Sequence, residues 1–69
     1  MNKWALEAKN GATKDSIQKE LKRRNIVWRQ SIGGRMVIPY DAIKKSSGME
    51  GFLLDLEASG AITIGHIAT

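Results

Sequence analysis

The residues of this chain best suited to chemistry are its cations, and most of them stand in the first forty positions. Residues 1–40 hold nine lysines and arginines against three acids, a net charge of 9 − 3 = +6, whereas residues 41–69 hold two against four, a net charge of 2 − 4 = −2. Lysine and arginine bind phosphate oxygens through charge and hydrogen bonds. A basic lobe on a neutral or acidic scaffold is typical of a protein that binds a polyanion, but excess lysine also serves solubility in small proteins.

Groups that could support catalysis or metal binding are scattered along the chain. There is no cysteine and one histidine, His66, so neither a disulfide framework nor a Cys/His zinc site is expected. No carboxylate or cysteine stands at ligand or catalytic spacing from His66, and the glycines form neither GxxxxGK[ST] nor GxGxxG. We therefore predict that the protein is not an enzyme, that it needs no cofactor or metal, and that His66 is structural or merely exposed.

A basic amphipathic helix is predicted at residues 13–24, TKDSIQKELKRR. Thr13 can cap its first turn, and Ile17 and Leu21 stand one turn apart and define a buried stripe. Lys19 lies opposite that stripe, on a polar face that is free to contact a ligand. Such a face is more often simply solvated, and cations near a helix C-terminus are favourable without a ligand because of the helix dipole.

A β-hairpin is predicted directly after this helix. Residues 26–32 and 35–40 are rich in β-branched and aromatic side chains, and Gly33-Gly34 between them can supply the two positive φ angles of a type I′ turn. The hairpin tip is small and basic, which suits a wing that touches phosphates. Pairing outward from a two-residue turn places Ser31 opposite Met36, Arg29 opposite Ile38 and Val27 opposite Tyr40.

The segments on either side of this stretch are predicted from caps and breakers. Residues 2–9 form a short helix in this prediction, and Asn10-Gly11 ends it. Pro39 ends the second strand of the hairpin because it lacks a ladder N–H. Asp41 then caps a third helix.

The last third of the chain contains the largest apolar stripe. Ser46-Ser47-Gly48 interrupts the third helix, which resumes over residues 49–58 and ends at Gly60. The stripe predicts a core surface and could also serve self-association. The tail 61–69, AITIGHIAT, predicts a short strand that joins the hairpin or pairs with another copy.

Length and hydropathy predict one domain over residues 1–69. A chain of this size forms a barely sufficient core, so association with another copy or a partner is expected. No apolar run approaches the ~20 residues of a membrane span, and the N-terminal MNKWALEAKNG lacks the apolar core of a signal peptide. We expect a soluble, cytoplasmic protein.

The order of these elements resembles the winged helix-turn-helix domains of small phage and transposon excisionases and of MerR-type regulators. The likeness is carried by WALEAKNGATKDSIQKELKRRN and SIGGRMVIPYDAIKK, and it covers residues 3–45. Gly11 and Ile17 are spaced like the turn glycine and the next buried aliphatic residue of that motif, whereas Glu7 occupies a position where the motif has a small residue. The resemblance implies an α+β fold of the winged helix-turn-helix type.

The resemblance also implies sequence-specific binding of double-stranded DNA, as in an excisionase or a transcription regulator. Helix 13–24 would enter the major groove and hairpin 27–38 would act as the wing. A domain this small reads few base pairs, so specificity would come from a homo-oligomer or a DNA-bound protein partner. The residues expected to contact DNA are Thr13, Lys14, Ser16, Gln18, Lys19, Lys22, Arg23, Arg29 and Arg35.

Two other functions remain open from the sequence. One is a protein-binding module or inhibitor that uses the apolar stripe of residues 49–56. The other is a binder of RNA or single strands that stacks bases on Trp28 and Tyr40, although the predicted register puts these two rings on opposite faces of the hairpin.

Overall fold

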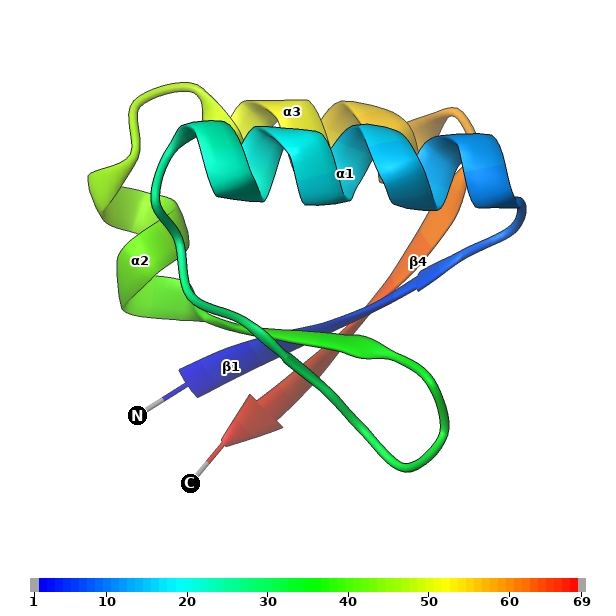
Figure 1. The fold of residues 1–69 in the computed structure, drawn as a ribbon, viewed down its shortest axis with the longest axis horizontal. Coiled ribbons are helices and arrows are strands. Elements are labelled where there is room, and N and C mark those ends of the chain that lie inside the picture. The colour runs from blue at the N-terminus through cyan, green and yellow to red at the C-terminus, as the bar shows by residue number, and fades with distance from the viewer. Residues whose placement is uncertain (1, 69) are drawn as a thin grey trace.

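The computed structural model describes residues 2–68, which form one four-stranded sheet and three helices (Figure 1). The elements in chain order are β1 (Asn2–Ala8), α1 (Gly11–Arg23), β2 (Arg29–Gln30), β3 (Met36–Pro39), α2 (Tyr40–Lys45), α3 (Met49–Ala58) and β4 (Ile62–Ala68). The strand order in the sheet is β2-β3-β1-β4, and every neighbouring pair is antiparallel. The predicted α+β class is therefore confirmed.

The chain builds two interleaved β-helix-β units. β1 and β2 run parallel with β3 between them, and β3 and β4 run parallel with β1 between them, which is the split βαβ arrangement. The helices cover one face of the sheet, and among residues 2–68 no helix covers the other face (Figure 1). We call this uncovered surface the open face. The core between helices and sheet consists of Trp4, Leu6, Ile17, Leu21, Ile26, Met36, Ile38, Ile43, Met49, Leu53 and Ile62.

The predicted helix at residues 2–9 is wrong, because residues 2–8 form the central strand β1. Trp4 and Leu6 are buried toward the helices, while Lys3 and Glu7 alternate with them and are more exposed. A segment this short gains little as an isolated helix, whereas as β1 it is hydrogen-bonded to β3 on one side and β4 on the other. The helix-turn-helix predicted from residues 2–24 therefore lacks its first helix.

α1 confirms the predicted basic helix, with a different cap. The side chain of Asn10 accepts a hydrogen bond from the backbone N–H of Thr13 at 2.8 Å, so Asn10 rather than Thr13 is the N-cap. The predicted stripe is buried, since Ile17 and Leu21 are 0% exposed. Asn25, at φ 57°, ends the helix in a left-handed conformation, and the N–H of the next residue, Ile26, bonds to the Leu21 carbonyl at 2.9 Å.

The hairpin exists, but its turn has three residues instead of two. Ser31 donates its N–H to the carbonyl of Arg35 at 2.8 Å, and Gly34 has a positive φ of 83° while Gly33 does not. This matches a type I turn followed by one left-handed residue. The register therefore moves by one, which exchanges the two faces of the strand. Gln30 pairs with Met36 and Arg29 with Val37, which corrects the predicted pairs Ser31–Met36, Arg29–Ile38 and Val27–Tyr40.

The breaks predicted in the second half of the chain are confirmed. Pro39 is the last residue of β3, and a turn at residues 46–48 separates α2 from α3. Asp41 lies in the first turn of α2 instead of capping it, because the helix already begins at Tyr40. Gly60, at φ 82°, follows α3.

The apolar stripe of α3 is mainly core, and the tail is a strand. Met49 and Leu53 are fully buried, and Leu54 is the exposed large apolar residue of this helix, at 44%. β4 pairs with β1 along its whole length, so it joins the sheet on the side away from the hairpin. None of the helices formed by residues 2–68 has the length and apolar character needed to span a bilayer.

Candidate nucleic-acid interface

The residues predicted to contact DNA fall into two groups. Seven lie on α1 and two on the hairpin. On α1, Ser16, Lys19, Lys22 and Arg23 are exposed, and Thr13, Lys14 and Gln18 are half-buried; on the hairpin, Arg29 and Arg35 are exposed.

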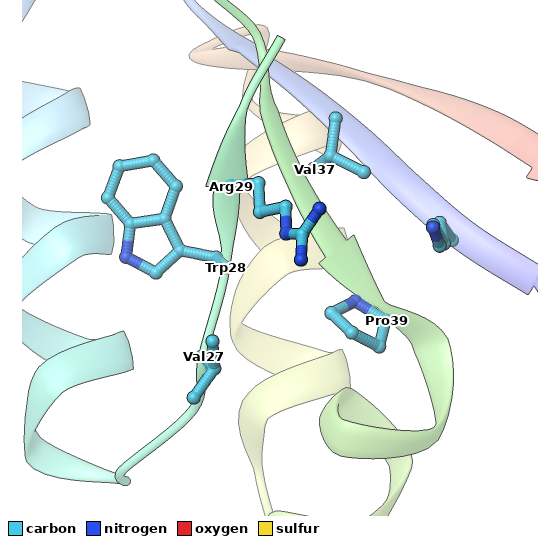
Figure 2. Close-up of a pocket in the computed structure, with 6 residues that line it drawn as sticks. Val27, Trp28, Arg29, Val37 and Pro39 are labelled. Carbon is cyan, nitrogen blue, oxygen red and sulfur yellow. The ribbon is translucent and has the colours of Figure 1, made fainter.

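These two groups lie on opposite sides of the sheet. Arg29 pairs with Val37, between Met36 and Ile38, and those two neighbours are buried beneath the helices. Because side chains alternate along a strand, Arg29 and Val37 belong to the open face. Figure 2 shows this alternation, with the Trp28 indole turned toward α1 and the Arg29 guanidinium on the other side of the strand. The structure thus does not bring the helix cations and Arg29 onto one surface.

Arg35 also lies on the open face, where it is partly neutralised. Its Nε is 3.3 Å from the Oε2 atom of Glu7 on β1, and both side chains are more than half exposed. An exposed ion pair of this kind contributes little to stability. Arg35 therefore has a carboxylate beside it that a phosphate would have to compete with.

The C-terminal end of α1 is organised by one carboxylate, that of Glu20. Its Oε2 atom lies 2.7 Å from Arg23 and 3.0 Å from Arg24. Hydrogen bonds from Arg23 and then Arg24 lower the pKa of Glu20, and the bond to Glu20 raises the pKa of Arg23. Arg24 also donates to Ser46 Oγ at 2.9 Å and to the Ser47 carbonyl, so it ties the end of α1 to the turn between α2 and α3.

A groove with basic walls runs along the edge of the molecule that carries the hairpin. It consists of two adjoining hollows of about 330 and 550 Å³, which share Val27 and Pro39. We call it the basic groove. The first hollow, shown in Figure 2, is lined by Lys3, Val27, Trp28, Arg29, Val37 and Pro39, and the second by Arg24, Asn25, Ile26, Val27, Pro39, Ala42, Lys45 and Ser46.

The groove exists because the β2–β3 ladder stops early. The next hydrogen-bonded pair outward from Arg29–Val37 would join Val27 to Pro39, two residues further along each strand, and proline has no N–H to donate. The chain that follows α1 therefore joins the sheet only at Arg29, and the side chain of Val27, two residues earlier, is 79% exposed. Lys3 is brought to the same place because β1 pairs it with Pro39.

The chemistry of the groove is that of an anion site with an apolar floor. Lys3, Arg24, Arg29 and Lys45 supply four cations, and the residues that line the two hollows include no aspartate or glutamate. Val27, Val37 and Pro39 form the floor between them. Phosphates can bind to the cations while sugars or bases cover the apolar side chains.

Two aromatic residues are held away from this groove. Trp4 and Tyr40 pack together with ring centroids 5.2 Å apart, and Trp4 is 4% exposed. The Tyr40 hydroxyl donates to Glu50 at 2.7 Å, and this hydrogen bond, with burial, raises the pKa of Tyr40. Trp28 alone lines the groove among the aromatic residues of the described chain, so it and Tyr40 do not form one stacking platform.

The sequence analysis missed most of the groove lining, including three of its four cations, Lys3, Arg24 and Lys45, and the apolar residue Pro39. Lys3 had been assigned to a helix, and the pairing of β1 with β3 places it beside Pro39. The alternation of the large apolar residues Trp4 and Leu6 with Lys3, Ala5 and Glu7 was the available signal for this strand. Among residues 2–68, no group of three or more histidine, cysteine, aspartate or glutamate side chains could hold a metal ion.

No protein-family model matches the chain, and no curated protein or solved structure matches it either.

Proposed function

We propose that the protein binds single-stranded nucleic acid in the basic groove. The observation that carries this proposal is the lining of the groove, where four cations surround an apolar floor and no carboxylate is present. The positive charge attracts a phosphodiester backbone. Arg24 is paired with Glu20 and Arg35 with Glu7, whereas no ion pair formed by residues 2–68 involves Lys3, Arg29 or Lys45.

The apolar floor favours a single strand over a duplex. In a single strand the bases are unstacked and can cover Val27, Val37 and Pro39 while the phosphates bind Lys3 and Arg29. A duplex keeps its bases stacked and offers mainly charged phosphates to a surface outside its grooves. Trp28 also lines this hollow, with its half-buried indole turned toward α1.

Double-stranded DNA is a second candidate ligand, and α1 supports it. The helix exposes Ser16, Lys19, Lys22 and Arg23 along its outer side, and an α-helix fits the major groove. The helical layer also contains α3, however, and every charged residue of α3 is acidic. Those carboxylates repel a duplex that lies across the layer, so we rank this candidate second.

Fluorescence anisotropy with one labelled oligonucleotide, used alone and annealed to its complement, separates these candidates. We expect tighter binding of the single strand, with log affinity falling linearly with log salt at a slope of about −2 for phosphate contacts to Lys3, Arg29 and Lys45. Absent or salt-independent binding of the single strand would overturn the proposal. Tighter binding of the duplex would favour the α1 surface instead.

A further inference from the structure

The outer edge of β4 is long and lacks the charged residues and prolines that normally prevent an edge strand from pairing with another strand. β2 and β4 are the two edge strands, and β2 has only two residues, of which one is Arg29. β4 has seven residues, and the chain from Ala58 to Thr69 contains no aspartate, glutamate, lysine, arginine or proline. Edge strands that remain unpaired in solution normally carry charge, proline or a bulge, because a long uncharged edge pairs with another strand.

The register identifies which backbone groups of β4 point outward. Lys9 donates its N–H to the Ala61 carbonyl at 3.0 Å, just before the β1–β4 ladder. In an antiparallel ladder the bonded positions recur at every second residue. Thr63, Gly65 and Ile67 therefore bond to β1, and the outward N–H and C=O groups belong to Ile62, Ile64, His66 and Ala68.

We propose that β4 pairs antiparallel with β4 of a second copy of this chain, with Gly65 on the two-fold axis. This register pairs residues 62–68 of one subunit with 68–62 of the other, so the whole strand is used. It joins the outward groups of Ile64 to those of His66 in the partner subunit, and those of Ile62 to Ala68. A two-fold interface brings the same surface patch together from both subunits, and here that patch places no charged residues opposite each other.

A second copy fits this edge better than a charged partner would. The net charge of +4 is concentrated on the hairpin side and on α1, and the β4 segment carries none of it. Ile67, which is 38% exposed on the open face, is covered by Thr63 of the partner subunit. The dimer has one continuous eight-stranded sheet with a basic groove at each outer end, because β2 and β4 lie at opposite edges.

A proline substitution at His66 tests the backbone pairing. His66→Pro removes an outward N–H without touching the bonds to β1, and His66→Ala removes the same imidazole, including its edge contact with Trp4, but keeps the N–H. By analytical ultracentrifugation, we expect wild type and His66→Ala to sediment at twice the 7.6 kDa chain mass in the micromolar range, and His66→Pro to sediment at that mass. Circular dichroism confirms that each variant is folded. A monomeric wild type, or dimerisation by a folded His66→Pro variant, overturns the proposal.

A cysteine scan tests the register even if the proline variant fails to fold. Gly65 and its symmetry mate form a non-bonded pair with Cα atoms about 4.5 Å apart, within disulfide range. A Cβ at Gly65 meets Ala5 atoms at 3.7 and 4.0 Å, which is ordinary contact. Since the chain has no other cysteine, Gly65→Cys should form a disulfide dimer under mild oxidation at least ten times faster than Thr63→Cys, which faces Ile67 of the partner subunit. Equal rates contradict the proposed register, and neither result depends on nucleic acid.

Discussion

Replacing Ile38 with alanine is expected to lower the free energy of unfolding by about 3 kcal/mol, the usual size for an isoleucine removed from a packed core. Ile38 is 0% exposed on β3 and pairs with Trp4 of the central strand β1. A domain of this length has a free energy of unfolding of roughly 3–10 kcal/mol, so the variant loses a third or more of it. Urea unfolding followed by circular dichroism measures the change, and the melting temperature should fall by more than about 10 °C.

Ile32→Ala is the matched control, because the same side chain is fully exposed at the hairpin tip. We expect its free energy of unfolding to change by less than about 0.5 kcal/mol. The pair of variants also tests the register of β1 and β3, which pairs Ile38 with Trp4. Equal effects of the two substitutions would show that Ile38 does not occupy the core.

Reversing two groove charges is expected to weaken single-strand binding by at least about 100-fold. Lys3 and Arg29 line the same hollow, and a charge-assisted hydrogen bond to phosphate contributes roughly 1.5–3 kcal/mol, which is about tenfold or more each. The double variant Lys3→Glu/Arg29→Glu should also reduce the salt slope by about 1.4, the value for two lost contacts. Anisotropy titrations at several salt concentrations provide both numbers.

Lys19→Glu/Lys22→Glu is the control for the net charge of the protein. It makes the same change in total charge on the exposed side of α1, which lies on the opposite side of the sheet from Arg29. We expect it to weaken single-strand binding by less than about fivefold, through long-range attraction alone. Equal losses in the two double variants would mean that binding depends on overall charge and not on the groove.

The elements best predicted from the sequence are those determined by local chemistry. Ile17 and Leu21 define the buried side of α1 by their spacing alone, and both are fully buried. The breaks at Pro39 and Gly60 follow from a missing N–H and a left-handed backbone, which are properties of single residues. Such features do not depend on what lies elsewhere in the chain.

The first strand could not be predicted in this way, because its stability comes from distant partners. Residues 2–8 pair with residues 36–39 and 62–68, and neither segment is near them in sequence. The pair Asn10-Gly11 also favoured the incorrect helix at residues 2–9, since an Asn-Gly pair suits the end of a helix as well as the beginning of one. The structure uses Asn10 as the N-cap of α1.

The candidate site was only partly predictable because it depends on the hairpin register. Gly33-Gly34 is compatible with a two-residue turn and with the three-residue turn that forms, in which Gly34 is left-handed. A change of one residue moves Arg29 from the face of Ile38 to that of Val37. Arg29 can be predicted as a contact residue from its charge, whereas Lys3 and Lys45 can be placed in the groove only once the tertiary structure is known.

Mapping of backbone amide shifts is the most direct test of the basic groove as the binding site. In a titration of ¹⁵N-labelled protein with a short single strand, we predict the largest shifts at Lys3, Val27, Trp28, Arg29 and Val37, which surround one hollow of the groove. The amides of Ser16, Lys19 and Arg23 on α1 should move little. Shifts concentrated on α1, with residues 27–29 unchanged at saturation, would contradict the proposed site.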